Sequence, residues 1–392
     1  MIELKEAMHY VTDKIDVSSL KIKEYISTDN MVPNRGGIID CESLPKANRV
    51  TRYEPGDILI SNIRPYFKKI WFADRISGCS NDVIVFRTNN DNWNKKFLYY
   101  ALSQDKFFDF MMASANGTKM PRGNKEIIPD FLIADYDIKR QTRIADILSA
   151  YDDLIKNNQQ QIKLLEEATQ RLYKEWFIDL HFPEYGSAEV IDGVPEGWKR
   201  TKIGEFLHVK SGYAFKSSWW QDAGYPVVKI KNIVNNTIDT SNIDYVSPEY
   251  TQKIPEFKLH KGDIVIAMTG ATIGKIGLIP EVQNLYTNQR VGKVFYNKEL
   301  TNPTPFVFCY YSQKCVLDQI IALSSSSSAQ PNISGEQLES FEIIANIETI
   351  NKFGQVMQPV FDTIICLYKQ IQLLIEARDR LLPKLMSGEI EV

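Results

Sequence analysis

The amino-acid sequence predicts an α+β protein in which two similar mixed α/β domains accompany two long heptad helices. Residues 161–176 (QIKLLEEATQRLYKEW) align without a gap with residues 370–385 (QIQLLIEARDRLLPKL), at an offset of 209 residues. Both segments place apolar side chains at alternating steps of three and four, which is the heptad pattern. The regions that precede them also match each other, so the whole plan is expected to occur twice.

The heptad stripe extends well beyond the aligned segments. In the first helix the expected inward positions are Ile144, Leu148, Tyr151, Ile155, Asn158, Ile162, Leu165, Thr169, Leu172 and Trp176. The same offset gives Phe353, Met357, Val360, Ile364, Leu367, Ile371, Leu374, Arg378, Leu381 and Leu385 in the second. A helix with one apolar stripe needs a partner, and the nearest candidate is the other copy. The polar Asn158 is a candidate for setting the register, and Pro383 is expected to kink or end the second helix.

The α/β domains precede the helices. Residues 56–60, 69–72 and 83–86 have the character of strands, and residues 94–112 have helical spacing. Residues 262–266 repeat the pattern of residues 56–60 at an offset of 206, and residues 331–341 repeat residues 121–131 at an offset of 210. We therefore expect a tandem duplication with domains at residues 1–140 and 199–345, helices at 141–180 and 346–392, and a linker at 181–198.

Composition limits the class of protein. The chain has 392 residues, 44% of them apolar, which suffices for about two or three domains. It contains no run of 18 apolar residues and no signal peptide, and its five Cys residues form no CxxC pair, so we expect a cytoplasmic protein without a zinc site. Counted over residues 1–140, 141–198, 199–345 and 346–392, the net charge of −3 divides into +2, −6, +2 and −1. Mildly basic domains permit contact with phosphates.

Catalytic motifs are weak. Residues 270–276 (GATIGKI) are one residue short of a phosphate-binding loop and end in Ile, so a turn between strands is the better interpretation. Asp130, Asp137 and Lys139 spell the carboxylate–carboxylate–lysine pattern of a metal-dependent nuclease, although their spacing is very short and an Asp-rich helix N-terminus is the more ordinary explanation. The His residues at positions 9, 181, 208 and 260 have no catalytic or metal-binding partner in the sequence. We therefore expect no catalytic residues and no metal site in this chain.

Polar and basic side chains in corresponding loops of the two domains are candidates for DNA binding. Arg and Lys recognise guanine, Asn and Gln recognise adenine, Ser and Thr hold phosphates, and a Tyr ring stacks on bases. In the first domain the candidates are Arg64, Tyr66, Lys68, Lys69, Asn116, Lys119 and Arg122. In the second domain they are Lys210, Ser211, Tyr213, Lys231, Asn232, Thr269, Thr272, Lys275, Arg290 and Gln330.

Several motifs together resemble a known family. They are residues 129–148 (PDFLIADYDIKRQTRIADIL), residues 162–177, the restart at 194–198 (VPEGW), residues 210–215 (KSGYAF) and residues 330–334 (QPNIS). With the repeat, they resemble the specificity subunit of type I restriction–modification systems over essentially the whole chain. The second copy departs from the first at residues 346–350, which lack the Lys-Arg-Gln entry of residues 139–141.

The resemblance implies a function and a set of partners. A protein of this family has two target-recognition domains that are related by pseudo-twofold symmetry and separated by an antiparallel two-helix coiled coil. Each domain reads one half of a bipartite DNA site. The helices set the unread spacer and dock two methyltransferase subunits that use S-adenosylmethionine. Restriction subunits bind through these methyltransferases, and ATP and Mg²⁺ belong to the partners rather than to this chain. The nuclease of Asp130, Asp137 and Lys139, and a coiled-coil adaptor that binds only proteins, stand as alternatives.

Overall fold

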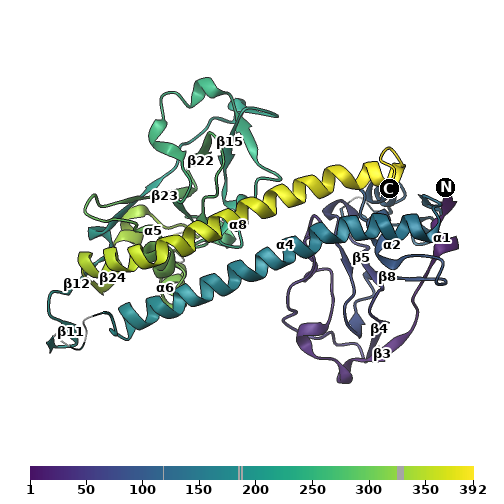
Figure 1. Cartoon of the computed structure of the whole chain (residues 1–392), viewed down its shortest axis with the longest axis horizontal. Helices are drawn as coiled ribbons and strands as arrows, with labels where there is room; N and C mark the ends of the chain where they lie inside the picture. Colours follow the sequence, from purple (N-terminus) through teal and green to yellow (C-terminus); the bar gives the residue numbers. More distant parts are fainter. Residues whose placement is uncertain (118, 184–185, 187–188, 325–330) are drawn as a thin grey trace. The chain divides into compact units, whose positions relative to one another are not determined.

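The computed structural model describes residues 1–117, 119–183, 186, 189–324 and 331–392 (Figure 1). The chain divides into two compact units. Unit 1 combines Met1–Leu154 with Leu374–Val392, and unit 2 is Ile155–Leu373. Two long helices, α4 (Ile138–Tyr173) and α8 (Ile347–Ser387), contribute residues to both units.

Unit 1 contains a four-stranded antiparallel sheet in the order β2-β8-β5-β6. Its strands are β2 (Met8–Tyr10), β8 (Val83–Thr88), β5 (Ile58–Ser61) and β6 (Ile70–Phe72). One face carries Ile58, Ile60 and Phe86, which share a buried core with Phe97 and Phe107 of the helices that follow the sheet. A second sheet contains β3 (Lys14–Asp16), β4 (Arg49–Tyr53) and β7 (Ser77–Cys79), while β1 (Ile2–Glu3) pairs with β9 (Leu132–Ile133).

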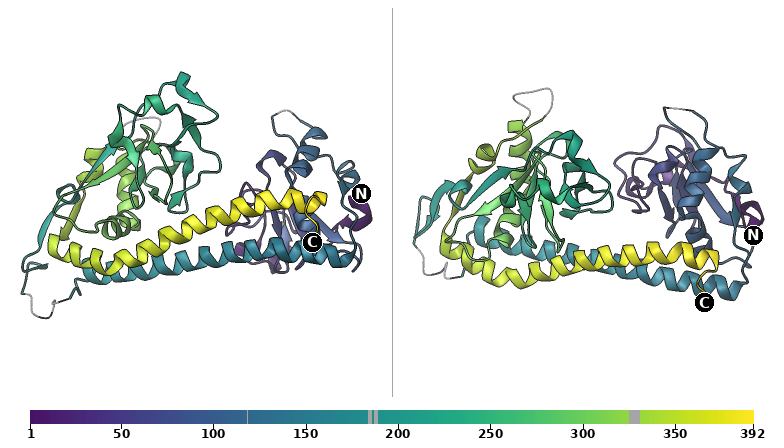
Figure 2. Two further views of the ribbon diagram at one scale, coloured as in Figure 1. Left: turned by 45° about the horizontal axis from the view of Figure 1, so that its top comes forward. Right: turned by 90° about the horizontal axis from the view of Figure 1, so that it is seen from above.

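Unit 2 repeats this plan. Its four-stranded antiparallel sheet has the order β13-β23-β20-β21, with β13 (Leu207–Ser211), β23 (Val291–Tyr296), β20 (Ile264–Ala267) and β21 (Ile276–Leu278). The strands β13, β23, β20 and β21 correspond in sheet order to β2, β8, β5 and β6 of unit 1. The tandem duplication predicted from the sequence is therefore present in the fold. Figure 2 shows this sheet and the helix segments packed with it from two further directions.

A larger second sheet distinguishes unit 2. Its order is β14-β18-β15-β22-β19, and β15 and β22 are parallel. The strands are β14 (Trp220–Gln221), β18 (Asp244–Val246), β15 (Tyr225–Val228), β22 (Leu285–Thr287) and β19 (Lys258–Leu259). Three short pairs complete the unit: β10 (Val190–Ile191) with β11 (Val194–Pro195), β12 (Lys199–Lys202) with β24 (Glu342–Ala345), and β16 (Ile233–Val234) with β17 (Thr237–Ile238).

The long helices run antiparallel within each unit. In unit 2, Trp176 packs on Phe353 with ring centroids 5.6 Å apart, and Asn158 Nδ2 donates to Gln370 Oε1 at 3.1 Å. Sequence numbers therefore rise along one helix as they fall along the other. In unit 1, Arg378 contacts Asp152 and the Tyr136 hydroxyl donates to the Met386 carbonyl. The α+β fold class and the antiparallel helix pair expected from the sequence are confirmed.

The heptad positions divide into two levels of burial. Ile144, Leu148, Ile155, Ile162, Ile364, Leu367 and Leu385 are buried, whereas Leu165, Leu172, Ile371, Leu374 and Leu381 are half-buried. Asn158 is also buried and forms the interhelical hydrogen bond described above. α8 ends at Ser387, shortly after Pro383.

One expectation about secondary structure is wrong. Residues 94–112 form two helices, α2 (Lys95–Leu102) and α3 (Asp105–Ala113), rather than one. The break occurs because Gln104 is extended and its side-chain amide donates to the Ala101 carbonyl, which ends α2. The matching helices of unit 2 are α5 (Thr304–Tyr311) and α6 (Lys314–Ser324). The segment 181–198, expected to be a linker, contains the β10–β11 hairpin.

Candidate nucleic-acid interface

In unit 1 the candidate residues lie on two loops that hydrogen-bond to each other. The β5–β6 loop (residues 62–69) carries Arg64, Tyr66, Lys68 and Lys69, and the 116–122 loop carries Asn116, Lys119 and Arg122. The Arg64 amide donates to the Pro121 carbonyl at 2.8 Å, and Ile63 forms a β-bridge with Arg122. Asn116 and Arg122 exchange two backbone hydrogen bonds that close the second loop. The two loops predicted separately therefore form one surface.

Unit 2 contains an equivalent arrangement. In the β20–β21 loop (residues 268–275), the Gly270 amide donates a hydrogen bond to the Pro331 carbonyl at 3.0 Å. Thr269 forms a β-bridge with Asn332, as Ile63 does with Arg122 in unit 1. Thr269 and Thr272 each bury a hydroxyl oxygen that has no hydrogen-bond partner among the described residues, and Lys275 is exposed.

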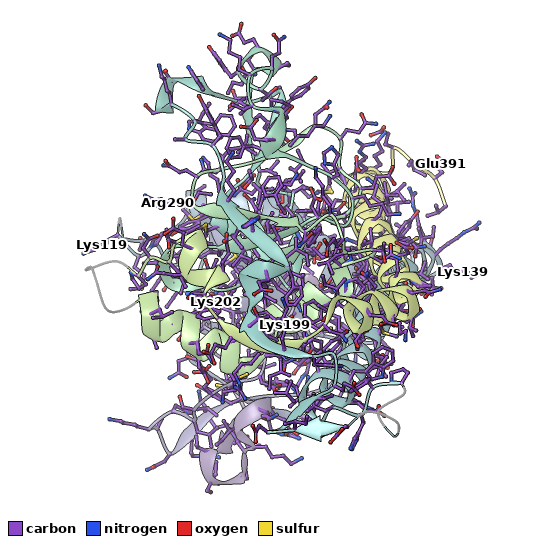
Figure 3. The ribbon with its side chains drawn as sticks, turned by 90° about the vertical axis from the view of Figure 1, so that its left-hand side faces the viewer. Lys119, Lys139, Lys199, Lys202, Arg290 and Glu391 are labelled. Carbon is purple, nitrogen blue, oxygen red and sulfur yellow. The ribbon has the colours of Figure 1, made fainter. Side chains whose placement is uncertain are left out.

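A second group of candidates in unit 2 surrounds an open pocket of about 390 Å³. The pocket is lined by Phe215, Ser217, Trp220, Lys229, Ile230, Lys231, Asn288, Gln289 and Arg290. Lys229 Nζ lies 3.5 Å from the centroid of the Trp220 ring, a close cation–π contact. Arg290 is exposed and is labelled in Figure 3. Three cations beside an aromatic ring form a surface that suits a phosphate and a stacked base.

The end of β13 brings further candidates to the same part of unit 2. Tyr213 accepts a backbone hydrogen bond from Gln289 at 2.9 Å, and its ring is parallel to that of Trp219 with centroids 6.2 Å apart. Lys210 Nζ lies 5.0 Å from the centroid of Phe257. The Ser211 hydroxyl donates to Met268 Sδ at 3.4 Å, and this weak bond leaves it available to a better acceptor.

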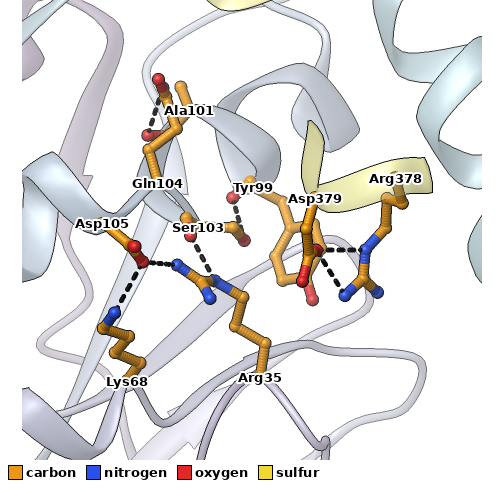
Figure 4. A network of polar contacts seen from close by, with 9 residues as sticks. All are labelled: Arg35, Lys68, Tyr99, Ala101, Ser103, Gln104, Asp105, Arg378 and Asp379. Atoms are coloured by element: carbon orange, nitrogen blue, oxygen red, sulfur yellow. Dashed lines mark hydrogen bonds and ion pairs between the residues drawn. The ribbon is translucent and has the colours of Figure 1, made fainter. Parts of the chain in front are cut away.

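Carboxylates hold several of the candidate cations. Lys68 Nζ donates to Asp105 Oδ1 at 2.8 Å, and Arg35 pairs with the same oxygen (Figure 4). In unit 2, Asp244 Oδ2 lies 3.1 Å from Lys229 Nζ and 2.8 Å from Lys231 Nζ. Burial opposes ionisation of both carboxyls, but their lysine and arginine partners outweigh it and lower the pKa values of Asp105 and Asp244. Burial lowers the pKa of Lys69, whose Nζ donates to the Thr28 carbonyl at 2.6 Å.

One candidate residue has a structural environment that the sequence did not indicate. The Asn232 side chain is only 3% exposed. Its Oδ1 accepts from the Lys229 amide and its Nδ2 donates to the carbonyls of Asp239 and Asn242, so its polar atoms already close a turn. Gln330, another candidate, lies outside the described residues.

The carboxylate pattern considered as a nuclease site has other roles. Asp137 Oδ1 accepts hydrogen bonds from the amides of Lys139 and Arg140, which caps the start of α4. Asp130 pairs with Lys5 at 3.0 Å. In the part of the chain that the structure describes, no group of three or more His, Cys, Asp or Glu residues is arranged to hold a metal ion. In the same described ranges, no helix is both long and apolar enough to cross a membrane.

The structure adds residues that the sequence reasoning missed. Arg35 and Asp105 support the β5–β6 loop, and Trp219 and Trp220 extend the aromatic surface of unit 2. Trp219 stacks on Tyr250 with centroids 4.3 Å apart. Two adjacent Trp residues after Ser217 and Ser218 are a visible signal in the sequence, because large rings in a polar stretch often bind ligands. No comparable local signal marks Arg35.

Comparisons with known proteins identify the family. The model of the type I restriction modification DNA specificity domain matches residues 23–167 and again residues 195–376. The chain belongs to this family. Its two matched regions coincide with the two halves of the duplication, so the specificity domain occurs twice.

Curated relatives and a solved structure agree. The chain is 27% identical to the MjaIX specificity subunit of Methanocaldococcus jannaschii over 76% of this chain and 69% of the relative. It is 22% identical to the HindI specificity subunit of Haemophilus influenzae over 97% of both chains. The crystal structure of the type I restriction–modification S subunit from M. genitalium matches this chain with a TM-score of 0.55 and 18% sequence identity. The match covers 98% of this chain and 95% of the S subunit, and it supports the fold. Specificity-family membership confirms the expectation of a non-catalytic DNA-recognition subunit, and the nuclease alternative is not supported.

Proposed function

We propose that each α/β domain reads one half of a bipartite DNA site and that α4 and α8 set the unread spacer between the halves. The observation that carries this proposal is the pair of equivalent loops. The β5–β6 and β20–β21 loops are built on the same strands and closed by the same backbone hydrogen bonds, from Arg64 to Pro121 and from Gly270 to Pro331. The side chains of the two loops differ, so the same domain architecture presents a different reading surface in each domain.

The side chains supply the chemistry of recognition. In the first domain Arg64, Arg122 and Asn116 provide groups that bind base edges, and Lys119 provides a cation for phosphate. In the second domain Lys231 and Arg290 line the aromatic pocket, while Lys210, Ser211, Thr269, Thr272 and Lys275 provide further phosphate and base contacts. Asn232 is not part of this proposal as a direct contact, because its side-chain amide already forms hydrogen bonds within its own turn.

The partners follow from the family and from the surface of the helices. We infer that two methyltransferase subunits dock on α4 and α8 and supply S-adenosylmethionine chemistry, and that restriction subunits with ATP and Mg²⁺ join through them in the cytoplasm. Exposed apolar residues on the helices support docking: Leu154 and Leu164 on α4 are 50% and 56% exposed, and Leu373 on α8 is 51% exposed.

Sequence-specific binding by the assembled complex tests the proposal. The target is first identified as the methylated positions in the genome of the host. The chain with its methyltransferase partner is then titrated with a duplex carrying that site and with duplexes in which either half is scrambled. We expect each scrambled half to weaken binding by at least ten-fold. Equal affinity for all duplexes contradicts the proposal, and a complex that binds no DNA favours the protein-only adaptor.

A further inference from the structure

The tip of the β5–β6 loop exposes two adjacent aromatic rings. Tyr66 and Phe67 belong to the 3₁₀ turn η3 (Pro65–Phe67) and are 47% and 36% exposed. Their ring centroids are 4.7 Å apart. Met120 of the hydrogen-bonded 116–122 loop is 48% exposed as well. The turn η3 lies against α3, yet both rings and Met120 keep a large exposed fraction that packing within unit 1 does not explain.

The backbone beneath these rings is held in an unfavourable conformation. Arg64 and Lys68, which flank η3, are both left-handed, with φ of 49° and 51°. Asn34 and Arg35 on the neighbouring loop are left-handed too, with φ of 55° and 61°. Non-glycine residues rarely adopt this conformation, and clusters of them persist where the surroundings enforce them, often at functional sites.

The enforcing contacts are specific. The Asn34 amide donates to the Phe67 carbonyl at 2.8 Å, and the Arg35 amide donates to the Lys68 carbonyl at 2.9 Å. Asp105, at the start of α3, binds both Lys68 and Arg35, and Arg35 Nε also donates to the Ser103 carbonyl (Figure 4). The Asp105 carboxylate therefore ties both left-handed loops to the helical core of unit 1.

The charges around the rings indicate the occupant. Lys69 Nζ lies 5.7 Å from the centroid of Phe67, and the exposed Lys119 and Arg122 belong to the adjoining loop. Aromatic side chains next to a lysine and close to a basic loop suit a polyanion whose bases offer flat faces, and DNA-bending proteins insert such side chains between base steps. An apolar protein surface offers nothing to the surrounding cations.

We propose that Tyr66 and Phe67 form a wedge that the first domain inserts into an unstacked base step of its half-site, with Asp105 as the positioning residue that presets the wedge. This inference rests on the proposed function. The second domain offers a natural contrast, since its equivalent turn, Gly270–Thr272, contains no aromatic residue. Step insertion is therefore confined to the half-site of the first domain, and there it makes recognition depend on how easily the DNA deforms.

DNA duplexes in which one base step is weakened by a mismatch test the proposed wedge. The complex of the full chain with its methyltransferase partner is titrated with target duplexes that carry a single mismatch at successive steps of the first half-site, excluding the methylated adenine. Wild-type complex should bind most tightly when one particular step is weakened, because the mismatch removes the cost of unstacking. The double variant Tyr66→Ala/Phe67→Ala removes both rings and leaves no side chain that can enter a base step, and should lose roughly ten-fold to hundred-fold in affinity for the intact site together with the step preference.

Charge and surface controls sharpen this test. The alanine variant removes no charge, so the slope of log affinity against log salt should not change, whereas replacing the exposed Lys119 (Lys119→Gln) should make that slope shallower. Ile76→Ala, which changes a 52% exposed apolar residue of the same unit outside the loop, should match wild type. If the alanine variant retains both affinity and step preference, or instead loses only its association with the methyltransferase, the wedge is wrong. If wild type shows no preference for the bipartite site, the proposed function itself fails.

The positioning role of Asp105 has a separate readout. 2-Aminopurine placed at the preferred step should become fluorescent on binding wild type, and Asp105→Ala should abolish this increase while the melting temperature of the complex stays within a few degrees. Asp105→Glu should restore the signal. Asp109→Asn, an exposed carboxylate one turn further along α3, is the matched control and should leave the signal intact. A full signal with Asp105→Ala excludes the positioning role.

Discussion

At the scale of single residues, several of the candidate DNA-binding cations are paired before any DNA arrives. Asp105 holds Lys68, Asp244 holds Lys229 and Lys231, and Asp82 lies 3.3 Å from Arg122. A phosphate that binds such a lysine must compete with its carboxylate. The number of counterions released on binding is therefore smaller than the number of candidate cations, and the salt dependence should be correspondingly shallow. Pairing also fixes the direction of each side chain, which favours base recognition over non-specific attraction.

The ion pair between Arg378 and Asp152 is a residue-scale test of how α8 is held in unit 1. Arg378 Nη1 lies 2.6 Å from Asp152 Oδ1, its side chain is 15% exposed, and the Tyr100 hydroxyl donates to the other oxygen of Asp152 at 2.5 Å. Burial disfavours the guanidinium, but Asp152 and Asp379 outweigh it and raise the pKa of Arg378. Arg378→Ala should lower the free energy of unfolding by about 2–3 kcal/mol, because it leaves Asp152 without its cation.

Denaturant titration measures this change. Arg380→Ala is the matched control on the same helix: Arg380 is 77% exposed and pairs with Glu376 on the surface of that helix, so the loss should stay below about 0.5 kcal/mol. Equal losses for the two variants contradict a structural role for the Arg378–Asp152 pair.

Glu166 of α4 carries the clearest pH dependence in unit 2. Burial raises the pKa of this carboxyl, while hydrogen bonds from the Tyr368 hydroxyl at 3.0 Å and from Asn236 Nδ2 at 3.0 Å partly oppose the rise. A carboxyl with a raised pKa binds its proton more tightly in the folded chain. Its contribution therefore favours folding at low pH and is lost as the pH rises from the ordinary value through the raised one.

Glu166→Gln removes this titration and keeps an oxygen acceptor for Tyr368. Relative to wild type, the variant should gain stability as the pH rises through that window and keep a constant difference above it. Thermal unfolding of both proteins between about pH 4 and pH 8 measures the difference. A stability difference that does not change with pH contradicts the raised pKa.

At the scale of elements, Gly354 shows tertiary contact overriding helix propensity. It lies inside α8, where alanine normally stabilises a helix by about 1 kcal/mol. A Cβ at this position lies 2.3 Å from the Asn302 carbonyl oxygen and 2.9 Å from that of Thr301. The Thr301 amide donates to Asn351 Oδ1 at 2.7 Å, which ties the approaching loop to α8. Gly354→Ala should therefore destabilise the chain by about 1–2 kcal/mol in thermal unfolding. Gln355→Ala, at the neighbouring exposed position, should change stability by less than about 0.5 kcal/mol. A stabilised Gly354→Ala variant overturns the argument.

The elements that the sequence predicted well are those with a strong period. The heptads of α4 and α8 and the matched strands β5 and β20 follow from spacing alone, because burial of one face leaves a regular pattern. The break between α2 and α3 does not. Apolar residues continue in helical spacing across Ser103 and Gln104, and only the side-chain bond from Gln104 to the Ala101 carbonyl ends the first helix.

The candidate interface was less predictable because its geometry is set by distant partners. Asp244 reaches Lys229 and Lys231 through the pairing of β15 with β18, and Arg35 reaches Asp105 across 70 residues of sequence. Neither contact has a local pattern. Asn232 illustrates the opposite error: a polar residue in a basic stretch reads as a ligand-binding group, yet its amide is used by the turn on which it lies.

At the scale of the whole molecule, each α/β domain begins and ends at one short strand pair. In unit 2, Lys199 at the start of β12 is the partner of Ala345 at the end of β24, and in unit 1, Ile2 is the partner of Ile133. Lys199 and Lys202 are seen on β12 in Figure 3. Because the two ends of each domain meet in a β-ladder, a domain from a relative can be joined at these residues without altering α4 or α8.

Domain exchange at these ladders tests whether the two domains read independently. Replacing residues 199–345 with the corresponding segment of a relative should change only the half-site read by the second domain and leave the other half and the spacer unchanged. The reciprocal control, replacement of residues 1–133, should change only the other half. Sequencing the methylated positions in cells that carry each chimaera with its methyltransferase partner measures both results. Independent reading predicts that the two changes add when both domains are exchanged. A chimaera that alters both halves, or shifts the spacer, shows that the domains and not the helices alone determine the geometry of the site.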